Sequence, residues 1–242
     1  MLYKDKPEMN QKSKLSEMLE DIAKLIKEAG GVCDNRQILR KELLGEENTS
    51  RKKEQKPKHE DCEGCNTDRM TEKRMCRCMY YFNLKEKDEK ARLKCDSCKI
   101  KYKWQNVGEI DIVEYEYPTK FLTKSVGGID LVIRDGDQEY AVEAKPIKSK
   151  ETLARMFAEI LTYTIECESN VRKPAICFFE GEEQWKEYFN LDEAGNQALK
   201  DIERYIKIYY FKKIEEDSGN VQKFKILPIE EAKNEQRTVS NR

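Results

Sequence analysis

Apolar positions recur at two spacings along this chain, and the wider spacing predicts helices. Between residues 13 and 29 the apolar side chains fall three and four positions apart, and a double glycine follows directly. Apolar residues at this spacing share one face of a helix, and paired glycines end it. Residues 149–168 repeat the amphipathic pattern. A further helix is expected over 183–204, with an interruption near Gly195.

The narrower spacing predicts strands, in segments that alternate apolar with polar residues or are apolar almost throughout. These segments are 107–118, 127–133, 139–145, 174–180, 206–214 and 223–229. Helices and strands mixed in this order predict an α/β fold (an α+β mixed sheet) with helices packed on the faces of the sheet.

Composition divides the chain further. The segment 51–60, RKKEQKPKHE, has no apolar residue to bury and is typical of a linker, and it is followed by six closely spaced cysteines. The expected organisation is an N-terminal helical segment that contributes to the core (1–50), a linker and cysteine-rich module (51–104), the main core (105–232) and a flexible tail (233–242).

Bulk properties argue against a membrane protein. The 242 residues carry a formal net charge of −1, so the distribution of charge says more about nucleic-acid binding than its sum. No segment approaches the roughly 20 apolar residues of a membrane span, and the N-terminus lacks the apolar core of a secretory signal. We expect a cytoplasmic protein with no membrane partner.

The paired spacing of the cysteines predicts metal ligation by thiolates. A CxxC pair presents two thiolates to one metal, and two pairs make a tetrahedral zinc site. Without an export signal, metal binding explains the pairs better than disulfides do. The candidate ligands are Cys62, Cys65, Cys76, Cys78, Cys95 and Cys98.

Spacing does not decide which cysteines share an ion. The first and third pairs together would form a zinc ribbon, the second pair competes for the third, and all six could hold two zinc ions. We expect one or two Zn²⁺ ions, with an iron–sulfur cluster as the rival interpretation.

The cysteine-rich module is also locally basic, with aromatic residues interleaved. Cations attract phosphates and aromatic rings stack on bases. We therefore expect Lys99, Lys101 and Lys103 to contact nucleic acid. The alternative is that a small zinc module uses its aromatic residues as core, while the exposed lysines follow from overall composition.

The hairpin predicted within 127–145 brings acidic residues together. With a two-residue turn at Gly136-Asp137, Asp130 lies directly opposite Glu143. A turn shifted back by one residue places Glu143 diagonally across from Asp130 instead. Because side chains alternate along a strand, both acids share one face in either register.

Lys145 shares that face, since it lies two residues beyond Glu143. Both faces of the hairpin are largely apolar, and burying charge is costly unless it is paired or binds a cation. Two carboxylates, the backbone carbonyl of Ala144 and waters would form an oxygen site suited to Mg²⁺ or Mn²⁺. The alternative is an ordinary acid–lysine ion pair on a solvent-facing side.

This pattern resembles the PD-(D/E)xK nuclease superfamily, whose signature is an acid in one strand and (D/E)xK in the next. Here the acid is Asp130, which follows Gly127-Gly128-Ile129 rather than a proline, and Glu143-Ala144-Lys145 is the second element. The resemblance covers about residues 107–180, where the expected strand–strand–helix–strand order is similar to that of the superfamily's core.

The RecB-type branch of that superfamily also places QxxxY on the following helix, where this chain has Glu159 and Tyr163. These residues share a helix face, with Arg155 one turn earlier. The resemblance implies that this face looks onto the active site, with Glu159 and Tyr163 taking part in catalysis and Arg155 in substrate binding. An ordinary polar stripe on a surface helix is the alternative.

The resemblance implies a restriction-endonuclease-like core with helices on both faces and a Mg²⁺-dependent nuclease activity on DNA, with RNA and a homodimer left open. Lys145 would orient the attacking water or stabilise charge on the phosphorus. Many members add a glutamate from the helix before the first core strand, and the candidates here are Glu17, Glu20, Glu109 and Glu116. The alternative is a non-catalytic zinc protein on a nuclease-like scaffold that binds nucleic acid or protein.

Overall fold

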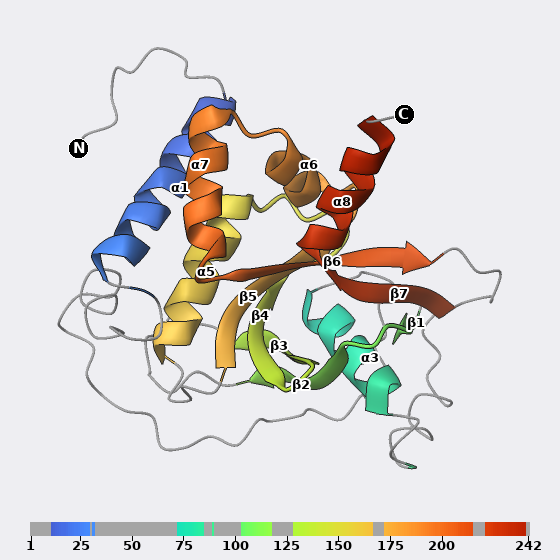
Figure 1. The fold of residues 1–242 in the computed structure, drawn as a ribbon. Coiled ribbons are helices and arrows are strands. Elements are labelled where there is room, and N and C mark those ends of the chain that lie inside the picture. Colours follow the sequence, from blue (N-terminus) through green and yellow to red (C-terminus); the bar gives the residue numbers. More distant parts are fainter. Residues whose placement is uncertain are drawn as a thin grey trace.

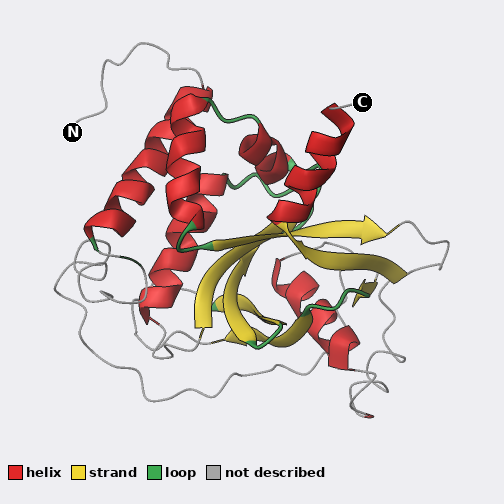
Figure 2. Ribbon diagram, viewed as in Figure 1, coloured by secondary structure: helices red, strands yellow, loops and turns green. Residues whose placement is uncertain are grey.

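The computed structural model describes residues 11–29, 31, 72–84, 89, 103–117, 128–166, 172–214 and 221–240. A seven-stranded mixed sheet runs through them (Figure 2). Its strands are β1 (Lys103–Asn106), β2 (Asp111–Tyr117), β3 (Ile129–Asp135), β4 (Gln138–Ala144), β5 (Arg172–Phe179), β6 (Lys207–Ile214) and β7 (Val221–Pro228). The predicted α/β fold with a mixed sheet is confirmed.

The sheet combines an antiparallel meander with a parallel centre. Its strand order is β1-β7-β6-β5-β4-β3-β2. Strands β2, β3 and β4 pair antiparallel, β4, β5 and β6 pair parallel, β6 and β7 pair antiparallel, and β1 joins the edge parallel to β7. Parallel neighbours need a crossover connection, and the helices between β4 and β6 provide it.

Helices cover both faces of the sheet (Figure 1). They are α1 (Gln11–Glu28), α3 (Glu72–Leu84), α5 (Leu153–Glu166), α6 (Glu183–Phe189), α7 (Glu193–Glu203) and α8 (Ile229–Ser240). On one face, α5 packs on β4 and β5, while α1 packs on α5 and α7. Leu19, Phe157 and Ile202 are fully buried in this layer, as the helical spacing of their apolar neighbours predicts.

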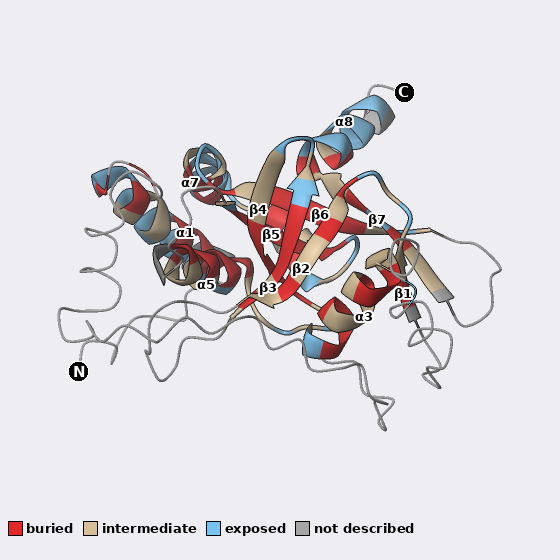
Figure 3. Cartoon of the chain, turned by 90° about the horizontal axis from the view of Figure 1, so that it is seen from below, coloured by how far each residue is buried: buried red, intermediate tan, exposed pale blue. Residues whose placement is uncertain are grey.

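The other face carries α3 alone among the described helices, and the sheet curls around it (Figures 1 and 3). Helix α3 contacts both edge strands, β1 and β2. Its residues Met75, Met79 and Phe82 lie at helical spacing and are buried against a core that includes Tyr115 and Trp104. This helix therefore fills the space that the curl of the sheet creates.

Three segments differ from the sequence-based organisation. Residues 72–84 and 103–106, assigned above to the cysteine-rich module, form α3 and β1 and belong to the main sheet layer. Residues 233–240, expected to be flexible, continue α8. That helix is held because Ile229 and Ala232 are buried and Lys233 pairs with Glu203 at 2.8 Å.

The predicted helix interruption near Gly195 is displaced by a few residues. Helix α6 ends at Phe189 and α7 begins at Glu193, so the break precedes Gly195, which lies inside α7. The cause is Asp192, whose side chain accepts a hydrogen bond from the Gly195 N–H at 2.9 Å and so caps α7.

Within the described part of the chain, no helix is both long enough and apolar enough to cross a membrane.

Candidate metal centre

The β3–β4 hairpin has the first of the two predicted registers. The pairs run from Leu131 with Val142 to Asp135 with Gln138, which leaves a two-residue turn at Gly136-Asp137. Gly136 has a φ of 59°, the left-handed conformation that a tight hairpin turn requires. Continued by one pair, this register places Asp130 opposite Glu143.

Asp130 occupies the point where the ladder between β3 and β4 ends. The last backbone pair is Leu131 with Val142. Beyond it, Oδ2 of Asp130 accepts a hydrogen bond from the Ala144 N–H at 2.9 Å. The carboxylate thus accepts a hydrogen bond from the buried N–H of Ala144, which lies beyond the last backbone pair between β3 and β4. In an extended strand the carbonyl of Ala144 points to the same side as its own N–H, which is toward Asp130.

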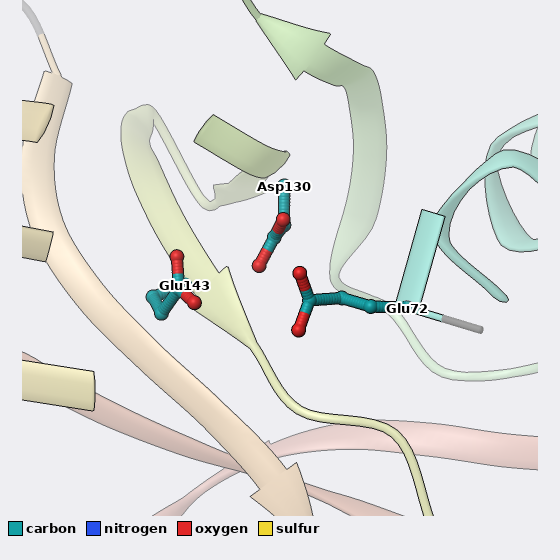
Figure 4. Close-up of side chains that lie close together, drawn as sticks. All are labelled: Glu72, Asp130 and Glu143. Atoms are coloured by element: carbon teal, nitrogen blue, oxygen red, sulfur yellow. The ribbon is translucent and has the colours of Figure 1, made fainter. Parts of the chain in front are cut away.

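Three carboxylates from separate elements converge at this point (Figure 4). Oxygen atoms of Glu72, Asp130 and Glu143 all lie within 4.8 Å of one another. Glu72 is the first residue of α3, so the helix inside the curl of the sheet delivers the third acid. Oxygen ligands at this spacing are those that a hard divalent cation prefers.

Glu143 and Lys145 are deeply buried, which excludes the solvent-facing ion pair as an explanation. Glu143 is 1% exposed and Lys145 is 3% exposed. Among the described residues, Oε2 of Glu143 has no N–H or hydroxyl donor. A buried carboxylate oxygen without a donor is a strong reason to look for a ligand.

The electrostatics show that these acids cannot all be ionised without a cation. Burial, and after it the charge of Asp130, raises the pKa of Glu143 to about 11. Burial and then the charge of Glu72 raise the pKa of Asp130. Burial also acts to raise the pKa of Glu159, but hydrogen bonds from Glu143 and Arg155 lower it instead. Asp130 and Glu143 therefore favour the binding of a proton or of a cation.

Lys145 lies at the centre of a wider acidic shell. Its Nζ atom lies 2.5 Å from Glu143, 2.7 Å from Glu151, 3.0 Å from Glu72 and 3.1 Å from Glu159. Burial alone would lower the pKa of Lys145, but these carboxylates, Glu143 foremost, raise it above its usual value. Lys145 is therefore held as a buried ammonium.

The predicted residues of α5 lie at the same centre. Glu159 reaches Lys145, and Arg155, with its side chain 59% exposed, pairs with Glu159 at 2.9 Å and with Glu151 at 3.5 Å. Burial, with the charges of Glu143 and Glu159, raises the pKa of Tyr163. Arg155 is committed to two acids of the site.

Glu72 and Glu151 are the residues of this centre that sequence reasoning missed. The candidates Glu17 and Glu20 are exposed on α1, which packs on the opposite face of the sheet from α3. Glu116 pairs with Lys73 at 3.2 Å instead. The signal for Glu72 was its position one turn before Met75 and on the same helix face, but the cysteine spacing around it pointed to a different module.

The structure describes only part of the predicted zinc and nucleic-acid residues. Cys76 is buried in the core of the α3 face, and Sγ of Cys78 accepts a hydrogen bond from the Trp104 N–H at 3.2 Å. Residues two apart on a helix do not share a face, so α3 does not direct the thiols of Cys76 and Cys78 toward one metal ion. Lys103 begins β1 at the sheet edge. Cys62, Cys65, Cys95, Cys98, Lys99 and Lys101 lie outside the described residues.

Comparison with protein families, with curated proteins and with solved structures gives no match.

Proposed function

We propose that the protein is a Mg²⁺- or Mn²⁺-dependent nuclease of the PD-(D/E)xK type that hydrolyses phosphodiester bonds, in DNA first of all. The observation that carries the proposal is the convergence of Glu72, Asp130 and Glu143 beside the buried ammonium of Lys145. A hairpin and a distant helix place these groups together, as a metal site with an adjacent cation requires.

The order of elements supports the restriction-endonuclease-like assignment. Strands β3 and β4 carry Asp130 and Glu143-Ala144-Lys145, α5 follows, and β5 pairs parallel with β4. This is the strand–strand–helix–strand order that the sequence resemblance implies. Helix α5 also brings Glu159 to Lys145, which fits a helix face directed at an active site.

The charge balance favours a bound cation during any reaction with phosphate. Four carboxylates, those of Glu72, Glu143, Glu151 and Glu159, pair with Lys145 or Arg155, and the carboxylate of Asp130 lies beside them. If all five acids were ionised, their excess of negative charge would repel a phosphodiester. A divalent ion at the three converging acids removes much of that excess.

The residues present fit such an ion. Glu72, Asp130 and Glu143 would hold it, with the carbonyl of Ala144 directed to the same side, and the unpartnered oxygen of Glu143 is an available ligand. A bound divalent ion supplies Lewis-acid stabilisation of the scissile phosphate and lowers the pKa of water. Lys145 donates hydrogen bonds from a fixed ammonium, which orients water and stabilises developing negative charge.

The test is a cleavage assay with matched variants. Supercoiled plasmid, linear duplex and single-stranded DNA, and RNA beside them, are incubated with Mg²⁺, with Mn²⁺ or with EDTA. The wild type should cut at least one DNA form with metal and none with EDTA. Lys145→Met should lower kcat by about 10²- to 10³-fold, the usual effect of removing one charge-stabilising donor. Glu17→Gln, an exposed acid of α1, is the control and should retain full activity.

Two results would contradict the proposal. The first is cleavage that persists in EDTA or in Lys145→Met, because the chemistry would then lie elsewhere. The second is metal binding and DNA binding by the wild type without cleavage under any condition, which would identify a non-catalytic binding protein on this scaffold.

A further inference from the structure

The four carboxylates around Lys145 fall into two groups. Glu72 and Glu143 belong to the candidate metal ligands, whereas Glu151 and Glu159 do not. A cation that draws Glu72 and Glu143 toward itself weakens their hold on Lys145. The ammonium then depends on Glu151, at 2.7 Å, and on Glu159, at 3.1 Å.

Glu151 lies in the loop between β4 and α5, so its position depends on how that loop is held. Lys148 in this loop has a φ of 64°, in the left-handed region that non-glycine residues adopt only at an energetic cost. A loop with such a residue keeps one conformation only when the surrounding structure determines it.

Helix α6 and Glu182, the residue that precedes it, provide that support through three side chains. Oε2 of Glu182 accepts from the Lys148 N–H at 2.9 Å, and Oε2 of Glu187 accepts from the Leu153 N–H at 2.6 Å. Between these anchors, Gln184 reaches the centre of the loop. The same segment therefore holds the loop from Lys148 to its junction with α5.

Gln184 makes the contact nearest to the metal centre. It is 1% exposed, and its Nε2 donates to the carbonyl of Glu151 at 2.5 Å and toward that of Ser149 at 3.4 Å. A side-chain amide has two N–H donors in a fixed plane, so it fixes the two carbonyls relative to each other. The backbone of Glu151 is thereby tied to α6.

We propose that Glu151, held by Gln184, is the anchor that keeps the Lys145 ammonium beside the metal centre when the cation takes Glu72 and Glu143. Both are positioning residues for the hydrolysis, and this part of the inference rests on the proposed function. The contact of Glu151 with Lys145 is close but not aligned as a hydrogen bond. Its effect is charge attraction, which a neutral amide of the same shape does not reproduce.

The first measurement follows the Lys145 ammonium itself by NMR in protein labelled with ¹⁵N at lysine Nζ, in saturating Mg²⁺. The wild type should show a slowly exchanging signal that Lys145→Met removes. Glu151→Gln and Gln184→Leu should broaden or abolish the signal. Glu17→Gln, at an exposed acid of α1 outside the loop and α6, should leave it in place. A signal unchanged in Glu151→Gln overturns the anchor, whether or not the protein cleaves DNA.

The second measurement is the split between kcat and KM for DNA cleavage. Glu151→Gln and Gln184→Leu should each lower kcat about tenfold to a hundredfold, as small misplacements of a catalytic group do, with KM little changed. Because Gln184 acts through Glu151, the double variant should be no slower than Glu151→Gln alone. If the two losses of kcat multiply in the double variant, Gln184 does not act through Glu151. Loss of the ammonium signal in Glu151→Gln, together with a wild type that shows the signal but cuts no substrate, would support the anchor and reject the nuclease.

Discussion

At the residue scale, the centre depends on a glutamate that lies 58 positions before Asp130 in the chain. Glu72 reaches the hairpin because α3 packs inside the curl of the sheet and begins next to Asp130 and Glu143. Its side chain is 34% exposed, whereas that of Glu143 is 2% exposed. Glu72 is therefore the candidate ligand on the solvent side of the site.

Glu72→Gln should weaken Mn²⁺ binding by at least about tenfold, because even changes outside the ligand shell commonly cost that much. Titration calorimetry with Mn²⁺ measures the affinity directly. The matched variant Glu20→Gln removes an exposed acid of α1 and should bind Mn²⁺ as the wild type does. Equal affinities for all three proteins would remove Glu72 from the centre.

Glu187 gives a pH-dependent prediction away from the metal ligands. Burial raises its pKa, and the hydrogen bond from the Leu153 N–H opposes that shift only in part. The folded state therefore binds this proton more tightly than the unfolded state, whose carboxyl has a pKa of about 4.3. Its contribution to the free energy of unfolding is complete below that pH and falls as the pH rises toward the folded pKa.

Glu187→Gln lacks this titration, so its stability relative to the wild type should increase from pH 4 to pH 7. Urea unfolding at intervals across that range measures the difference. Glu20→Gln, measured in parallel, accounts for the loss of one negative charge. A difference between Glu187→Gln and the wild type that is constant with pH, or declines, would show that the Glu187 carboxyl does not titrate as its burial requires.

At the element scale, the contact between α1 and α7 is fixed by a glycine. A Cβ added at Gly195 would lie 2.5 Å from Oγ of Ser16 and 3.2 Å from Leu191. Ser16 donates to Asp192 at 2.7 Å, and Asp192 caps α7. The same few atoms therefore close the helix interface and start the helix.

Gly195→Ala should destabilise the protein by about 1–3 kcal/mol, as overpacking does. The sign of the change in the free energy of unfolding is informative, because glycine replaced by alanine in an exposed helix stabilises it by about 1 kcal/mol. Thermal and urea unfolding measure the effect. Combining it with Ser16→Gly, which removes the clashing side chain, should recover part of the loss. A more stable single variant would mean that α1 and α7 are not this close.

At the scale of the whole molecule, α3 joins the candidate metal centre to the hydrophobic core on its own face of the sheet. Met79 is fully buried between this helix and the sheet. Met79→Ala should cost about 2–5 kcal/mol in the free energy of unfolding and should weaken Mn²⁺ binding, since α3 carries Glu72. Met18→Ala, at a methionine of α1 that is 41% exposed, is the control and should change neither. A Met79→Ala protein as stable as the control would separate α3 from the core.

The zinc prediction also belongs to the whole molecule, because the candidate thiolates precede α3, lie within it, and follow it before β1. Cys95→Ser should lower the zinc content of the purified protein, measured by elemental analysis, if the CxxC pairs ligate zinc. Cys177→Ser, at a buried core position of β5, controls for loss of any thiol. Equal zinc contents in both variants would refute the role of Cys95.

The sequence by itself determined the strands from β2 to β7, the helices α1, α5, α6 and α7, and the local half of the candidate centre. Asp130, Glu143 and Lys145 could be placed on one face because a hairpin has short-range contacts and a strict period of two. The tertiary structure alone decided that α3 belongs to the core, that Glu72 completes the acidic triad, and that α6 holds the loop of Glu151. Those contacts join segments far apart in the chain, and they arise from the curl of the sheet and the burial of apolar faces, which local spacing does not encode.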